Sequence, residues 1–179
     1  MTTKSVLDRA TTNTELDGVS ADIGLLIIRV VFGALLVAHG TQKLFGWFSG
    51  PGWEANAAGF DAMGYNPGKF FGTLAGLCEL GGGLLLALGL VTPLASAIVL
   101  GTMINAVNSM WSLGLFGKDT YELPLLFAVV GAGFAFTGPG KFSLDHGRPW
   151  QRHGFVWGVG AVVLAVVAAI LTLILKWAL

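Results

Sequence analysis

The feature that most constrains this chain is an apolar run over residues 23–38 that a single charge, Arg29, interrupts. A soluble helix keeps one polar face toward water, whereas a helix that is apolar on every side suits the hydrocarbon interior of a bilayer. An ionisable side chain at the centre of such a helix costs roughly 3 kcal/mol, so it normally faces a partner within the protein. We therefore expect a membrane-spanning first helix whose arginine is turned toward other helices.

The composition extends this expectation to the whole chain. Of its 179 residues, 54% are hydrophobic and 11% are charged, whereas soluble domains have about 25% charged residues. The formal net charge is zero and no basic cluster is present, which argues against a nucleic-acid partner. Cys78 is the single cysteine, so a dithiol relay within the chain is excluded. The three histidines show no metal-ligand or haem-ligand spacing, and no metal and no covalently bound cofactor is predicted.

Glycine and proline turns divide the rest of the chain into predicted membrane spans. The expected fold class is an all-α membrane protein, a four-helix transmembrane bundle with an additional C-terminal transmembrane helix. A polar tail over residues 1–22 is predicted to be disordered, with Asp22 capping the first helix. The spans are expected at residues 23–47, 69–91, 94–113, 121–138 and 155–175, with a short surface helix or ordered loop at 53–63 and a surface loop at 141–153.

The distribution of positive charge gives an expected orientation. With five spans, the N-terminal side holds one more lysine or arginine than the other side, which favours a cytoplasmic N-terminus. The residues on the N-terminal side are Lys4, Arg9, Lys141, Arg148 and Arg152, and those on the other side are Lys43, Lys69, Lys118 and Lys176.

Arg29 and Glu79 form the first candidate polar site. Glu79 lies on a helical stripe of small residues with Gly72, Gly76 and Gly83, and small residues mark close helix packing in membranes. Both charges should therefore be buried in the hydrocarbon region, where each needs an opposite charge, and we predict that they are partners. Such a pair can fix the register of two helices, and it can also line a ligand or proton path; the two interpretations are compatible.

A second polar group lies near the other end of the first helix, at His39, Gln42 and Lys43. His39 and Lys43 are four residues apart and share a helical face. A lysine that extends toward the membrane surface beside an interfacial histidine is common. A histidine can also change its charge near neutral pH, which suits a proton carrier or a donor to a quinone carbonyl.

Three further polar residues are secondary candidates. Asn105 and Asn108 lie on one side of the third span, where asparagines more often join helices by hydrogen bonds than bind ligands. Glu122 lies at the start of the fourth span, where the helix dipole alone favours a carboxylate.

The ordered set of motifs resembles the DoxX family of small bacterial membrane proteins. The set comprises Arg29 with Gly33, HGTQKLFGW at residues 39–47, ELGGGLLLALGL at 79–90, YEL at 121–123 and GPGKFSLD at 138–145. The resemblance covers residues 23–146 and leaves out the tail and residues 147–179, the surface loop and fifth helix. It implies a four-helix core in the bacterial inner membrane. It also implies, as for some members, association with membrane redox systems: thiosulfate or sulfide oxidation, quinone pools and oxidative-stress complexes. The family offers no agreed catalytic residues.

The sequence leaves the class of function open. One hypothesis is a quinone-interacting subunit or partner of a membrane oxidoreductase, and another is a non-catalytic anchor for a redox partner. A small-solute or proton path is a third. The partners expected are the lipid bilayer and redox-enzyme subunits, and a homo-oligomer is also compatible with the sequence.

The quinone hypothesis places a site between the first two spans. His39 and Lys43 would lie at its mouth, with Arg29 and Glu79 deeper. The apolar slot would be formed by Leu35, Leu36 and Phe45. A quinone needs such a slot for its tail and one or two donors for its carbonyl oxygens.

Overall fold

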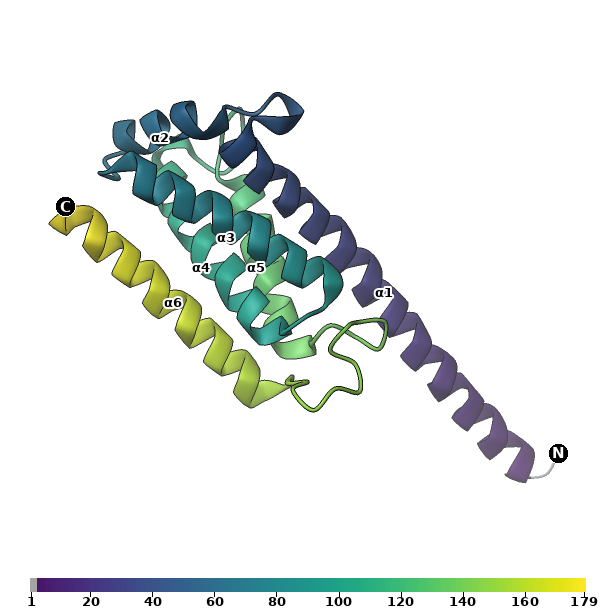
Figure 1. Ribbon diagram of the computed structural model, residues 1–179. Helices are drawn as coiled ribbons and strands as arrows, with labels where there is room; N and C mark the ends of the chain where they lie inside the picture. Colours follow the sequence, from purple (N-terminus) through teal and green to yellow (C-terminus); the bar gives the residue numbers. More distant parts are fainter. Residues whose placement is uncertain (1–2) are drawn as a thin grey trace.

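The computed structural model of the protein describes residues 3–179, with side chains described from residue 16 onward. Every regular element in this part of the chain is a helix (Figure 1). In order, the elements are α1 (Thr3–Phe45), the 3₁₀ helix η1 (Trp47–Ser49), α2 (Gly52–Ala62), α3 (Gly68–Leu88), α4 (Thr92–Met110), the 3₁₀ helix η2 (Trp111–Leu113), α5 (Glu122–Thr137) and α6 (Phe155–Ala178).

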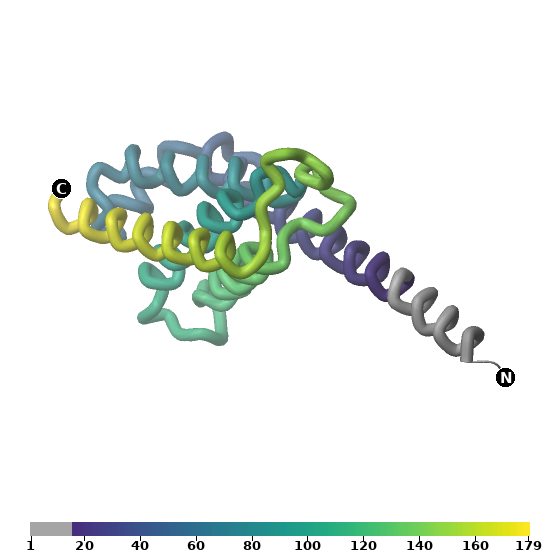
Figure 2. Tube along the Cα trace, turned by 90° about the horizontal axis from the view of Figure 1, so that it is seen from below, coloured from purple at the N-terminus to yellow at the C-terminus, as the bar shows by residue number. Residues whose placement is uncertain are grey.

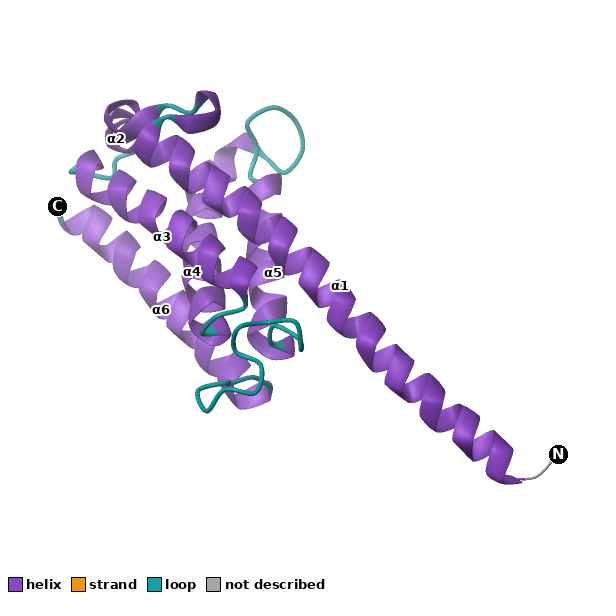
Figure 3. Ribbon diagram, turned by 45° about the vertical axis from the view of Figure 1, so that its right-hand side comes forward, coloured by secondary structure: helices purple, strands orange, loops and turns teal. Residues whose placement is uncertain are grey.

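Four segments of the described chain are long and apolar enough to cross a membrane. They are Leu16–Phe45, Gly68–Leu88, Thr92–Leu113 and Phe155–Ala178. α5 is shorter, about 24 Å at 1.5 Å per residue, yet it runs alongside α4 from one end of the bundle to the other (Figure 3). Large apolar side chains such as Ile27, Leu77 and Val163 face outward, as a lipid-facing surface requires. The predicted all-α membrane bundle with an additional C-terminal helix is confirmed.

Glycines bring α1 and α3 into close antiparallel contact. Gly33 lies against Gly83, and Gly40 lies against Gly76 and Leu80, so that a Cβ built on Gly33 would be 2.6 Å from the Gly83 carbonyl oxygen. Small residues allow this approach because no side chain separates the two backbones. The predicted small-residue seam is therefore confirmed, and it places Glu79 in the interior of the bundle.

A tight turn joins α3 to α4 and makes them an antiparallel hairpin, as the sequence predicts. α3 ends at Gly89, whose positive φ of 63° lets its N–H return to the Leu86 carbonyl oxygen. α4 begins at Thr92, with Pro93 in its first turn. This turn lies at the same end of the bundle as the loop that joins α5 to α6 (Figure 3).

α2 and α6 cover the rest of the bundle. α2 lies across the ends of α1 and α3, and the Asn56 Nδ2 donates to the Gly72 carbonyl oxygen over 3.0 Å. A short helix near residues 53–63 is therefore confirmed. α6 packs on α4 and α5 through buried alanines, including Ala161 and Ala165.

Two expectations about the N-terminal region are wrong. α1 continues upstream of Ile23, so residues 16–22 are helical and do not belong to a disordered tail. Asp22 lies inside the helix and caps nothing; its carboxylate instead accepts the N–H of Lys141 over 2.9 Å. Residues 1–2 of the predicted tail lie outside the described residues.

Candidate functional site

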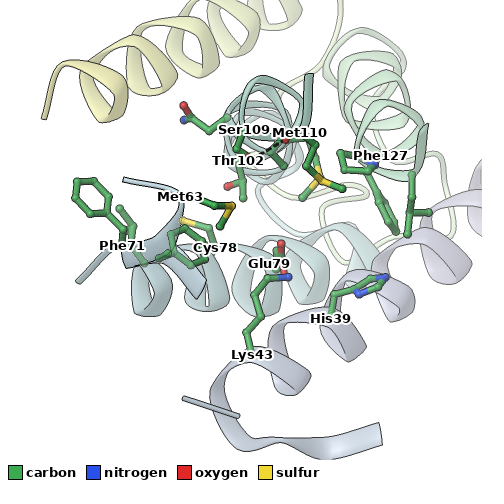
Figure 4. Close-up of a pocket in the computed structure, with 18 of the residues that line it drawn as sticks. His39, Lys43, Met63, Phe71, Cys78, Glu79, Thr102, Ser109, Met110 and Phe127 are labelled. Carbon is green, nitrogen blue, oxygen red and sulfur yellow. Dashed lines mark hydrogen bonds and ion pairs between the residues drawn. The ribbon is translucent and has the colours of Figure 1, made fainter. Parts of the chain in front are cut away.

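A cavity of about 1130 Å³, partly open to the outside, lies between α1, α3, α4 and α5 (Figure 4). α2, the loop after η2 and one face of α6 complete its wall. Most of the lining is apolar, with Leu36, Met103 and Phe127 among its buried side chains. Its polar groups are therefore few, and they define what the cavity can recognise.

The central polar feature of the cavity wall is an ion pair between α1 and α3. The Lys43 Nζ lies 2.6 Å from the Glu79 Oε2, and Figure 4 shows Lys43 extended toward Glu79. The Glu79 side chain is 8% exposed and that of Lys43 is 26% exposed. Both side chains line the cavity, so a polar group that entered it could join or replace this contact.

The predicted Arg29–Glu79 pair is wrong, and the direction of helical side chains explains why. The Cα–Cβ bonds of a helix tilt toward its own N-terminus. Since α1 and α3 are antiparallel, Lys43 and Glu79 lean toward each other. Arg29 leans away from Glu79, and it reaches Ala87 near the C-terminal end of α3, about 12 Å further along the axis at 1.5 Å per residue.

Arg29 instead holds backbone carbonyls at the far end of the bundle. Its Nη1 donates to the Ala87 oxygen over 2.5 Å, and its Nη2 donates to the Phe142 oxygen. The residue is only 2% exposed, and it does not line the cavity. Its charge is therefore used to tie α1 to the end of α3 and to the loop after α5.

His39 lies in the cavity wall, one helical turn from Lys43. Its ring meets the edge of Phe127 from α5 at a centroid distance of 6.0 Å. Among the described residues it has no hydrogen-bond partner. An imidazole nitrogen without a partner in the protein can bond a ligand that enters the cavity.

The other sequence candidates divide between the cavity and the surface. Asn105 and Glu122 line the cavity. Gln42 does not: its Nε2 donates to the Phe48 oxygen over 3.2 Å and supports the turn after α1. Asn108 is exposed and lies outside the lining. The structure therefore brings His39, Lys43, Glu79, Asn105 and Glu122 together.

The apolar slot also differs from the one expected. Leu36 lines the cavity, but Leu35 and Phe45 are exposed on the outer side of α1. Their places are taken by residues from other helices, such as Leu74 of α3 and Phe127 of α5. The slot therefore lies among α1, α3, α4 and α5 and not between α1 and α3 alone.

Sequence reasoning missed several polar residues of the cavity wall, among them Cys78 and Tyr65. Cys78 lies beside Thr102 of α4 (Figure 4), and its position next to Glu79 in the chain was the only signal available. Tyr65 comes from the turn between α2 and α3 and is 3% exposed, and its hydroxyl has no hydrogen-bond partner in the described part of the chain. Burial raises the pKa of this hydroxyl, so Tyr65 stays neutral and can donate.

The geometry defines a multi-pass helical membrane protein with a polar ion pair beside an apolar cavity. Among the described residues, no three His, Cys, Asp or Glu side chains are grouped so that they could hold a metal ion. The DoxX family model matches residues 24–112, and the chain belongs to the DoxX family. No curated protein and no solved structure matches the chain.

Proposed function

We propose that the cavity binds a small membrane-dissolved molecule of the quinone class, and that the protein acts as a subunit or partner of a membrane redox system. The observation that carries this proposal is the Lys43–Glu79 ion pair in the wall of an apolar cavity. A quinone combines an apolar ring and tail with carbonyl oxygens that accept hydrogen bonds. It therefore matches a slot that offers many apolar contacts and few donors.

The size of the cavity supports a ligand of this class. Ligand pockets commonly measure about 300–1,000 Å³, and this cavity has about 1130 Å³. A quinone ring with the first part of its tail would fit in this volume. The ring would lie toward Lys43 and His39, since these side chains supply the donors, and the tail would lie along apolar residues such as Met103 and Phe127.

The polar residues have separate roles in this proposal. The Lys43 ammonium donates to one carbonyl oxygen, and Glu79 keeps that ammonium in place. His39 donates to the ligand or carries a proton to it, because an imidazole has one nitrogen that donates and one that accepts. Reduction of a quinone needs electrons together with protons. The described residues hold protonatable groups, and we assign the supply of electrons to a partner subunit.

The quinone content of the purified protein tests this function. The protein is isolated from its native bacterial inner membrane, and the bound quinone is extracted and quantified. His39→Ala and Lys43→Ala should each lower quinone retention about tenfold, on the order of 1.4 kcal/mol, without loss of helix content. Gln42→Ala is the matched control, because Gln42 lies on the same helix but outside the cavity.

The same variants separate this function from a scaffold. If both cavity variants keep wild-type quinone content and partner binding, the quinone site is wrong and a non-catalytic anchor for a redox partner takes its place. If quinone is lost from the Gln42→Ala variant as well, the loss reflects general damage to α1.

We also propose the cytoplasmic orientation of the N-terminus, which the excess of lysine and arginine on that side supports.

A further inference from the structure

The loop between α5 and α6, residues 138–154, is firmly attached to the end of the bundle opposite α2. Arg29 donates to the Phe142 oxygen, and the Lys141 N–H donates to Asp22 of α1. Asp145 joins the loop to the turn between α3 and α4. Figure 2 shows the loop between the start of α6 and α1. Its outward side chains are therefore presented from a fixed backbone.

The charges of this loop are separated by direction. Its one carboxylate, Asp145, is 1% exposed and accepts hydrogen bonds from the N–H groups of Val91 and Thr92, the Thr92 hydroxyl and the Trp150 indole. Arg148 and Arg152 are exposed, and neither forms an ion pair with a described residue. The outward surface of the loop is thus cationic, because its acid is directed inward and fully hydrogen-bonded.

Two tryptophans hold these arginines in place. The Arg148 guanidinium lies 5.9 Å from the ring centre of Trp150, and that of Arg152 lies 5.5 Å from the ring centre of Trp157. Both rings are about half exposed. Tryptophan is typical of the membrane–water interface. The Arg152 Nη1 donates to the Pro149 and Gln151 oxygens, and its Nε and Nη2 make no hydrogen bond with a described residue and stay available for a phosphate. The pairs therefore place cations at the depth of lipid head groups.

A hollow of about 300 Å³ lies beside this surface, between the loop and α1. Leu25 and Pro139 supply apolar lining, and His146, Gln151 and His153 supply polar groups. Lys141 and Asp22 also line it, and because the Lys141 Nζ is 3.5 Å from the Asp22 Oδ2 their opposite charges offset each other there. The hollow therefore combines the apolar and polar contacts that the glycerol region and head group of a phospholipid require.

We propose that the surface formed by Arg148, Trp150 and Arg152 of the loop and Trp157 of α6 binds the head group of an anionic phospholipid. A lipid is the fitting occupant because α5 and α6, on either side of the loop, are apolar helices of the membrane bundle. A basic residue at the membrane surface strengthens binding to anionic lipid roughly fivefold. This proposal does not depend on the quinone site.

Lipid binding to the full-length purified protein tests the proposal. Native mass spectrometry would compare the retention of phosphatidylglycerol and phosphatidylcholine. The wild type should retain phosphatidylglycerol preferentially, and the double substitution Arg148→Gln/Arg152→Gln should weaken its binding by roughly 25-fold. The matched control is Lys69→Gln/Lys118→Gln, which removes the same charge at the other end of the bundle and should preserve the preference.

Each other outcome would overturn the proposal. Equal retention of both lipids by the wild type would exclude selection for an anionic head group. An equal loss in the control pair would show a general effect of net charge. Displacement of the lipid by inorganic phosphate at the same concentration would show a phosphate site rather than a lipid surface.

If the double variant loses its helical circular dichroism, the single substitutions replace it, with a weakening of roughly fivefold expected from each.

Discussion

The buried charges at the two ends of the bundle have different kinds of partner. At the loop end, Arg29 and Asp145 bind mainly backbone groups, which cannot change their place without unfolding a turn. At the cavity end, Lys43 and Glu79 bind each other's side chains beside open space, and His39 has no hydrogen-bond partner among the described residues. One helix, α1, supplies a charged residue to each end.

The difference shows why burial alone does not mark a functional residue. Arg29 is more deeply buried than Lys43, yet its guanidinium donates to carbonyls that would otherwise lack partners inside a membrane protein. The Lys43 ammonium is held by one side-chain carboxylate beside the cavity and can turn to a ligand. We therefore expect substitutions at the loop end to lower stability most, and substitutions at the cavity end to lower ligand binding most.

The largest loss of stability is expected for Arg29→Leu. The change removes two hydrogen bonds from a charged donor, each contributing about 1.5–3 kcal/mol, and leaves the oxygens of Ala87 and Phe142 without donors. The free energy of unfolding should fall by about 3–6 kcal/mol, measured by denaturation in detergent micelles. Arg148→Leu is the control, since Arg148 is exposed. An unchanged unfolding midpoint for Arg29→Leu would remove the structural role assigned to the loop end.

Asp145→Ala should have the next largest effect. The substitution leaves the N–H groups of Val91 and Thr92 without acceptors at the start of α4, which costs about 2–3 kcal/mol. Asp145→Asn keeps one acceptor oxygen and should lose about half as much. Hydrogen exchange at the first turn of α4 would measure the change locally. Equal protection from exchange in the wild type and the alanine variant would contradict the role of Asp145 as the acceptor for these N–H groups.

A smaller loss is expected where α1 and α3 touch between the two ends. A Cβ on Gly83 would lie 2.7 Å from the Gly33 oxygen, whereas a Cβ on Gly81 would meet nothing within 4 Å. Gly83→Ala should lower the free energy of unfolding by about 1–3 kcal/mol through overpacking. Gly81→Ala, on the same helix, should have no such effect. Unfolding in detergent compares the two, and equal midpoints would contradict the close seam.

Much of the fold was predictable because its signals are local. The apolar spans, the turn at Gly89 and the packing of Gly76 and Gly83 follow from residue type and helical spacing. The start of α1 was not predictable in the same way, because Asp22 resembles a helix cap. Its carboxylate instead accepts the N–H of Lys141, 119 positions later in the chain. No local sequence pattern indicates such a contact.

Three of the four residues proposed for the candidate polar site lie in the wall of one cavity, whereas Arg29 lies outside it. The three are His39, Lys43 and Glu79. The error was to pair Glu79 with Arg29 on the basis of opposite charge in the membrane. Two facts determine that Glu79 pairs with Lys43. One is the antiparallel register of α1 and α3, which the Gly33–Gly83 contact sets, and the other is the tilt of each side chain toward the N-terminus of its own helix. A single sequence gives the tilt but not the register.

A double-mutant cycle gives the smallest and most specific test of the comparison. Lys43→Gln and Glu79→Gln should each lower the free energy of unfolding, because each change leaves the other charge without its partner, and the pair should show a coupling of about 1 kcal/mol. The cycle between Arg29→Gln and Glu79→Gln should instead be additive within about 0.5 kcal/mol, since Arg29 binds Ala87 and Phe142. Unfolding of the single and double variants in one detergent measures both cycles. Coupling in the Arg29 cycle without coupling in the Lys43 cycle would reverse the pairing, and the proposed division between the two ends of the bundle would then be lost.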